Sequence, residues 1–479
     1  MIQRRWQLPI PPIPNWIKHY GMRFMPFADA ASPDLPLPRL LRLSLFQVVI
    51  GMTTALLVGT LNRVMILELG IPAWWVAISV GLPMVFAPFR ALIGYRSDTH
   101  PSALGLRRIP YLWMGSLLLF GGLAIMPFAL LLLSEVEHAN QWLGQVGACL
   151  AFLLVGAGIQ VTQTAGMALA NDLSDDERRP RVVALLYTMQ LLGMLASSVA
   201  FAFLLEDFSS VRLIKVIQGC AALVLLINLF SLWKQEARQR RRGQRVDGGF
   251  SKSWHELLAQ PYMRRFLWTL GLGTSAFAMQ DIVLEPYAGE VLGLSVGATS
   301  SLTAFAATGS LLAFGLAAHW LNKGFPAFRL ASLGVLLGVV AFVGVIFSAP
   351  LQAPGLFKAC VALIGFAGGL FSVSMLVSAM NFAQPEFNGL VLGAWGAVQA
   401  TAAGVSMALG GALRDAIGHW AQQGALGEAL RSNVTGYSAV YHVEMYLLFV
   451  VLAALGPMLR KQGRSPHESH RFGLAELPG

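Results

Sequence analysis

The chain has 479 residues, of which 56% are hydrophobic and 12% are charged, and its formal net charge is +10. Soluble domains carry about twice that share of charged residues, and apolar runs of about 20 residues, enough to span a bilayer core, recur along this chain. The composition therefore excludes a mainly soluble protein. Because basic residues gather in the cytoplasmic loops of membrane proteins, the positive charge does not indicate a nucleic-acid partner.

The apolar runs fall into two groups of six. A Pro-rich basic arm at 1–41 precedes them, a basic linker at 234–263 separates them, and a tail at 460–479 follows. The N-terminal half, 42–233, has predicted spans at 42–67, 73–95, 110–133, 141–170, 181–205 and 212–233. The C-terminal half, 264–459, has predicted spans at 264–289, 295–321, 326–348, 354–382, 388–413 and 436–459. The sequence predicts an all-α membrane protein with twelve transmembrane helices in two six-helix halves.

Charged residues alternate between the predicted loops. Lys and Arg are dense in the arm, in the turns after the second and fourth spans, in the linker and in the tail, whereas the other turns of the N-terminal half hold Glu68, Glu135 and Glu206. Because basic loops stay on the cytoplasmic side, we expect both termini and the linker to be cytoplasmic. Two six-helix halves joined by such a linker are typical of the major facilitator architecture.

The loop between the second and third spans reads GYRSDTHPSALGLRRIP and resembles the Gly-x-x-x-Asp…Arg-Arg signature of the major facilitator superfamily. A glycine allows close helix approach, and an aspartate can pair with an arginine, so the loop can latch the two halves. An ordinary basic turn is the alternative. Arg90 lies near the cytoplasmic end of its span and is expected to pair with Asp98 or Asp172. The predicted gating and structural residues are Gly94, Asp98, Arg107, Arg108, Arg90 and Asp172.

Charged residues inside apolar spans are candidates for function because burying them unpaired is expensive. Asp281 and Glu285 are four residues apart and therefore share one helix face. We expect Arg63, at the corresponding place in the first span, to pair with Asp281 or Glu285; the alternative places the acids at the membrane surface, in contact with water. The candidate cavity-binding residues are Asn62, Arg63, Gln280, Asp281, Glu285 and Glu290.

His442 lies within the last predicted span and is the candidate ligand for a metal or a magnesium pigment, although a lone histidine is more often a hydrogen-bonding residue. The chain has no phosphate-binding glycine loop and no nucleophile motif, so the sequence does not predict an enzyme.

Several longer strings carry a more specific resemblance. They are LPRLLRLSLFQVVIGMTTALLVGTLNRVMILELGIP, FAPFRALIGYRSDTH, RRPRVVALLY and MQDIVLEPYAGEVLGLS. From about Phe24 to the end of the last span the chain resembles the PucC/LhaA family of purple phototrophic bacteria. The resemblance implies an assembly factor for a light-harvesting antenna complex in the photosynthetic inner membrane. It does not distinguish LH1 from LH2, and LH1 is slightly favoured on overall similarity alone.

The same resemblance implies the partners and the cofactor. Antenna polypeptides would be the partners, with the reaction centre or pigment-synthesis enzymes as further ones, alongside membrane lipids. Bacteriochlorophyll would be the cofactor, and oxygen ligands such as Gln280 or the nearby acids would suit its magnesium. A proton-coupled secondary transporter, with Arg63, Asp281 and Glu285 in its pathway, is the alternative function.

Overall fold

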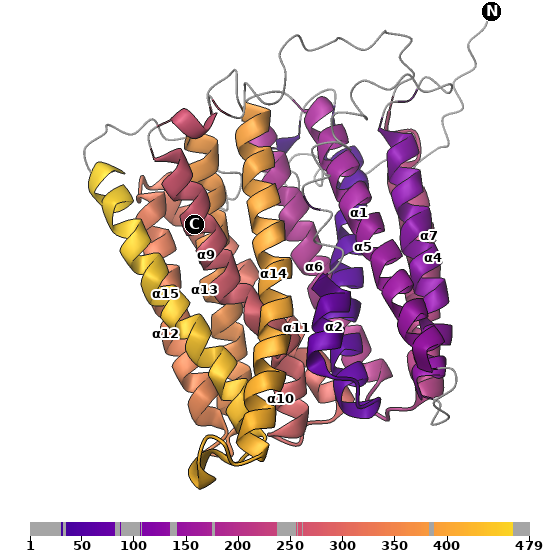
Figure 1. Cartoon of the computed structure of the whole chain (residues 1–479). Coiled ribbons are helices and arrows are strands. Elements are labelled where there is room, and N and C mark those ends of the chain that lie inside the picture. The colour runs from indigo at the N-terminus through magenta and orange to yellow at the C-terminus, as the bar shows by residue number, and fades with distance from the viewer. Residues whose placement is uncertain are drawn as a thin grey trace, which may run out of the picture.

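The computed structural model describes residues 30–31, 35–81, 87, 106, 108–134, 141–174, 178–236, 255, 257–260, 262–382 and 388–462. All regular secondary structure in these ranges is helical, so the predicted all-α class is confirmed. The helices run roughly side by side and form one elongated bundle (Figure 1). Among the predicted site residues, Arg90, Gly94, Asp98 and Arg107 lie outside the described ranges, as do most of the N-terminal arm and the linker.

The N-terminal half begins with a long helix whose middle and end are wound as π-helix. Its segments are α1 (Leu37–Thr54), η3 (Ala55–Leu61) and η4 (Val64–Glu68). The following elements are α2 (Ala73–Gly81), α4 (Ile109–Ser134), α5 (Gln141–Asp172), α6 (Arg179–Leu204) and α7 (Ser210–Leu232). The π-helical stretches are a local departure from the continuous α-helix expected here, and such stretches occur frequently at functional sites.

The C-terminal half begins with a helix that is broken near its end. Its segments are α9 (Met263–Ala278), the 3-10 turn η6 (Met279–Ile282) and α10 (Leu284–Glu290). The following elements are α11 (Val296–Asn322), α12 (Ala327–Ser348), α13 (Pro354–Phe382), α14 (Asn388–Gln422), η7 (Glu428–Leu430) and α15 (Val434–Gln462). Ten helices in the described ranges are long and apolar enough to cross a membrane, and α2 and the broken helix correspond to the second and seventh predicted spans.

The two halves lie beside each other, with the N-terminal half in indigo and magenta and the C-terminal half in red to yellow (Figure 1). They meet where α14 packs on α2 and where α11 packs on α6. Glycines permit the first contact: a Cβ at Gly81 would lie 2.8 Å from the carbonyl oxygen of Gly404, and a Cβ at Gly411 would lie 2.7 Å from that of Ala73. Backbones can therefore approach closely between the halves, as is usual for helices in membranes.

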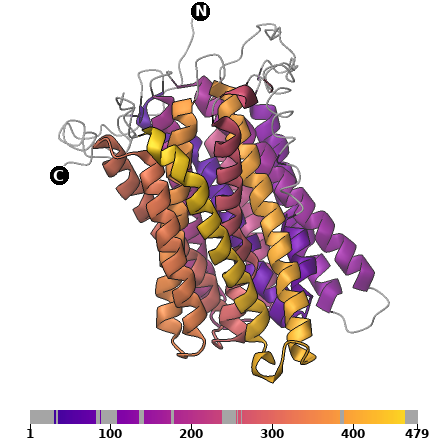
Figure 2. The same cartoon turned by 60° about the vertical axis from the view of Figure 1, so that its left-hand side comes forward.

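The view turned by 60° shows the same elongated bundle, with α15 crossing its front at a slant (Figure 2). We use the term outer end for the end where η4 finishes and α2 begins, which is the lower end in Figure 1. The charge pattern predicts that this end faces away from the cytoplasm. At the opposite end, Asp172 at the end of α5 forms an ion pair with Arg108, with 2.9 Å between Oδ2 and Nε.

Candidate functional site

The break in the seventh spanning helix frees backbone groups, and side chains from other helices satisfy them. The backbone N–H of Gln280 donates to Oε1 of Glu444 in α15, with 2.5 Å between the heavy atoms. Asn62, between η3 and η4, donates from Nδ2 to the carbonyl oxygen of Ile282 at 2.8 Å and to that of Asp281 at 3.3 Å. Because lipid offers no hydrogen bonds, irregular backbone at this depth needs such partners. Asn62 therefore ties the N-terminal half to the break.

Two carboxyl groups beside the break are deeply buried. Glu285 is 2% exposed and Glu444 is 0% exposed. Thr303 donates to Oε1 of Glu285 at 2.9 Å, and Glu444 Oε1 is occupied by the Gln280 N–H. The second oxygen of each carboxyl group has no hydrogen-bond partner in the described part of the chain. Side chains of this kind are costly to bury in a membrane protein and mark functional sites.

The site around Glu285 is tightly packed across the boundary between the halves. A Cβ at Gly59 would lie 2.6 Å from Oε1 of Glu285 and 2.8 Å from Oγ1 of Thr303. A hydrogen bond of 3.1 Å between Thr60 and Ser300 adds a further contact between the halves. Glu285 is buried, and so is the neighbouring Gln280. The alternative that placed the acids of the seventh span in contact with surface water is therefore wrong for Glu285.

The predicted ion pair of Arg63 with Asp281 or Glu285 is wrong. Arg63 pairs with Glu68 at 2.6 Å and donates to the carbonyl oxygen of Leu294 at 3.3 Å. The physical reason is the π-helical winding, which joins residues five apart and so brings Glu68 within reach of Arg63. Arg63 still interacts electrostatically with Glu285, while Asp281 accepts a hydrogen bond of 3.1 Å from Nε2 of Gln280.

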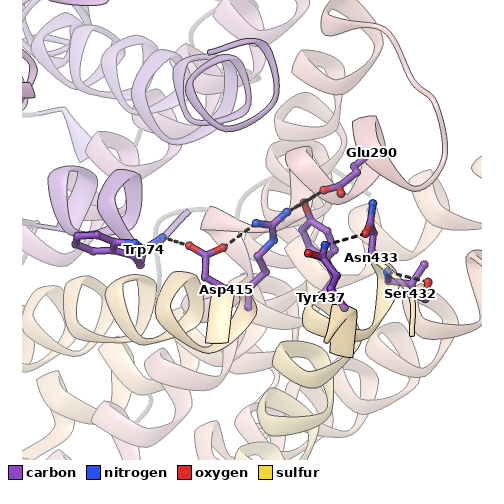
Figure 3. Close-up of polar contacts among 9 residues, drawn as sticks. Trp74, Glu290, Asp415, Ser432, Asn433 and Tyr437 are labelled. Carbon is purple, nitrogen blue, oxygen red and sulfur yellow. Dashed lines mark hydrogen bonds and ion pairs between the residues drawn. The ribbon is translucent and has the colours of Figure 1, made fainter. Parts of the chain in front are cut away.

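Glu290, at the end of α10, belongs to a second polar network at the outer end (Figure 3). Arg414 donates to Oε2 of Glu290 at 2.8 Å and to the hydroxyl of Tyr437 at 2.8 Å, and that hydroxyl donates to the same oxygen of Glu290 at 2.5 Å. The guanidinium also lies 4.6 Å from the centre of the Tyr437 ring. Three helices of the C-terminal half are thereby joined around one cation.

Asp415 extends this network to the N-terminal half. It accepts from Arg414 at 2.7 Å and from the backbone N–H of Trp74 at 2.7 Å (Figure 3). Trp74 lies in the first turn of α2, where backbone N–H groups lack partners within the helix and the helix dipole favours an anion. Asp415 thus caps a helix of the opposite half. A cavity of about 310 Å³ lies beside it, lined in part by Pro72 and His419.

His442 is half-buried on α15, and its Nδ1 lies 2.7 Å from the carbonyl oxygen of Ser438. Since the carbonyl can only accept, Nδ1 carries a proton, and in the neutral imidazole Nε2 then holds the lone pair. No group of three or more metal-ligating side chains occurs among the described residues.

Sequence reasoning identified Asn62, Arg63 and the acids of the seventh span but missed Glu444, Arg414 and Asp415. Glu444 was detectable by the same signal as Asp281, because it is an acid inside a long apolar run. Asp415 offered no such signal, since its partner is a backbone group of a distant helix.

Comparison with known proteins gives one family match and several similar sequences. The model of the family described as PUCC protein matches residues 60–463. The "Uncharacterized protein in puhA-bchM intergenic region" of Rhodobacter capsulatus is 50% identical over 96% of this chain and 98% of its own. "Protein PucC" of Rhodovulum sulfidophilum is 51% identical over 84% of this chain and 90% of its own.

The chain is also similar to more distant proteins in sequence and in structure. The "Bacteriochlorophyll synthase 44.5 kDa chain" of Rhodobacter capsulatus is 26% identical over 87% of this chain and 94% of its own. Among solved structures, a bacterial homologue of the iron transporter ferroportin in an inward-facing state superimposes with a TM-score of 0.65 at 13% identity, over 89% of this chain and 99% of that one. The structural similarity confirms the major-facilitator-like fold.

Proposed function

The chain belongs to the PUCC protein family, and we propose that it is an assembly factor for a bacterial light-harvesting antenna complex, chaperoning antenna subunits, delivering bacteriochlorophyll or both. The observation that carries the proposal is the family match over residues 60–463, together with about 50% identity to relatives along most of their length. We propose the photosynthetic inner membrane as its location, with both termini cytoplasmic. We propose no catalytic role.

The antenna complex served is proposed to be LH1 in preference to LH2. The names of the two relatives at 50% and 51% identity mention neither complex, so sequence identity does not separate LH1 from LH2. The test is therefore a deletion of the gene in its native host, with near-infrared absorbance of the LH1 and LH2 bands measured separately. Loss of the LH1 band alone is expected. If both bands keep their wild-type intensity, the proposal is refuted.

His442 is the described side chain that best fits a bacteriochlorophyll. Histidines that ligate metals usually donate their other ring N–H to a carbonyl or carboxylate, and His442 does so through Nδ1 to Ser438. Tyr446 and Phe449 follow at helical spacing on the same side of α15 and are 64% and 50% exposed, which provides an apolar surface for a macrocycle. His442 would hold the pigment's magnesium through Nε2. Bound there, the pigment itself would supply light absorption, which makes binding visible.

The partners follow from the same proposal. Small antenna polypeptides would dock on lipid-facing helices of the bundle, where large apolar side chains such as Phe128 and Phe203 are exposed. Co-purification of tagged protein from native membranes, followed by mass spectrometry and absorbance, tests this. Antenna polypeptides and pigment are expected in the eluate and absent from a control preparation with an unrelated tagged membrane protein; colourless, partner-free protein would contradict the proposal.

A second candidate function, a proton-coupled secondary transporter, is favoured by one observation. Asp281, Glu285 and Glu444 gather at the break of the seventh helix, and two of them keep an unpartnered buried oxygen in the described structure. Transporters of this architecture use intramembrane acids as proton relays. Substrate-dependent proton movement in liposomes containing only this protein would support the second candidate, and its absence would remove it.

A further inference from the structure

A groove of about 930 Å³ opens on the side of the N-terminal half at the end opposite the outer end. It lies where α1 begins and α7 ends, and it reaches α6 through Met189. Its apolar part includes Leu45 and Phe230, and Phe230 is 60% exposed. A large aromatic side chain exposed in this position is suited to contact with an acyl chain.

Three cations line the same groove, and the described residues of its lining include no acid. They are Arg39, Arg42 and Lys234. Arg39 is held in place because it donates to Gln235 through Nη2 at 2.5 Å and through Nε at 3.2 Å. Three positive charges at the rim of an apolar groove match an amphiphile with an anionic head.

Two of these cations have no ion-pair partner in the described part of the chain. Nε of Arg42 is buried and lacks any hydrogen-bond partner there. Lys234 is exposed and follows the last turn of α7 with a φ of 54°, a left-handed conformation that is uncommon for a residue other than glycine. The nearest acid in sequence, Glu236, is engaged by the backbone N–H groups of Arg108 and Ile109.

We propose that this groove binds an anionic phospholipid, with its phosphate on Arg42 and Lys234 and an acyl chain along Leu45 and Phe230. Arginine and lysine both recognise phosphate, and Arg42 and Lys234 both line the groove without an ion-pair partner among the described residues. The charge pattern places this end of the bundle in the cytoplasmic leaflet, where anionic lipids concentrate. This inference does not depend on the proposed assembly function.

The test measures the thermal unfolding midpoint of the full-length protein in detergent, titrated with phosphatidylglycerol, phosphatidylcholine or inorganic phosphate. Phosphatidylglycerol should raise the midpoint of the wild type most. Each cation removed should weaken the apparent affinity about fivefold, so Arg42→Gln combined with Lys234→Gln should weaken it about 25-fold. Arg329→Gln is the matched control, because Arg329 is an exposed arginine at the start of α12 and is absent from the groove lining.

Each titration tests a separate part of the proposed lipid site. An unchanged affinity for phosphatidylglycerol in the double variant would overturn the site, and an equal shift with phosphatidylcholine would overturn the role of charge. An equal shift with inorganic phosphate would show a free-anion site and overturn the lipid assignment. Lys234→Gln alone, at an exposed position, provides the fivefold step without risk to the fold, so misfolding of the double variant does not prevent a result.

Discussion

Glu444 should stabilise the break in the seventh helix mainly as a hydrogen-bond acceptor. It accepts the Gln280 N–H at 2.5 Å in a site where Glu444 is fully buried. Replacing Glu444 with Leu leaves that N–H without an acceptor, and an unsatisfied buried donor costs about 1–3 kcal/mol. Replacing it with Gln keeps a carbonyl oxygen in the same place and removes a buried acid, so the free energy of unfolding should change by less than about 1 kcal/mol.

The assay is equilibrium unfolding in detergent, read as helicity by circular dichroism, with both variants compared with the wild type. Asn62→Leu serves as the companion variant because Asn62 supplies the other side of the break through Asp281 and Ile282. Glu444→Leu and Asn62→Leu should both be destabilising. The reasoning is refuted if Glu444→Gln destabilises as much as Glu444→Leu, since the ionisable acid and not the acceptor would then be decisive.

Three further predictions test other parts of the structure. Gly59→Ala should lower the free energy of unfolding by about 1–3 kcal/mol because its Cβ would displace Glu285, whereas Gly121→Ala, where a Cβ meets nothing within 4 Å, should be neutral or stabilising; equal effects would contradict the packing argument. Arg414→Gln leaves Glu290 and Asp415 without their shared cation and should increase labelling of a cysteine introduced at Trp74 by a membrane-impermeant thiol reagent; unchanged labelling would show that this network does not hold α2 against α14. His442→Phe should remove co-purifying pigment absorbance while Tyr446→Phe, which keeps the aromatic surface, should not; pigment retained by His442→Phe would exclude this ligand.

The fold was predictable because the bilayer sets the length of each apolar run and the basic linker divides the runs into two groups of six. Ten of the spanning helices in the described ranges satisfy that length and composition directly. The second and seventh predicted spans are the two exceptions. The seventh span is broken at Met279–Ile282 beside Pro286, and the predicted second span is described only from Ala73 to Gly81. Hydropathy reports how apolar a run is, and it does not report how the backbone is wound.

The candidate site was only partly predictable for the same reason. Arg63, Asp281 and Glu285 were visible as charges within apolar runs, but their pairing depended on the local winding of the helix. A regular α-helix brings residues three and four apart together, and Glu68 is five residues after Arg63. The π-helical turn therefore allows Arg63 to pair with Glu68 of its own helix, and not with the acids of the seventh span. No sequence pattern available from one chain distinguishes this turn from an ordinary one.

Four hydrogen bonds join the halves near the outer end. They are Thr60 with Ser300, Asn62 with the carbonyl of Ile282, Arg63 with that of Leu294 and Asp415 with the Trp74 N–H. The two neutral hydrogen bonds are worth about 1 kcal/mol net each and the two that involve Arg63 or Asp415 about 1.5–3 kcal/mol each, so together they contribute on the order of 5–8 kcal/mol. Reversing a two-state equilibrium from 1:99 to 99:1 takes about 5.5 kcal/mol of differential binding, the same scale. A ligand that separated the halves would therefore need a differential binding free energy of this size, and separation would uncover the unpartnered carboxyl oxygen of Glu285, which lies beside this boundary.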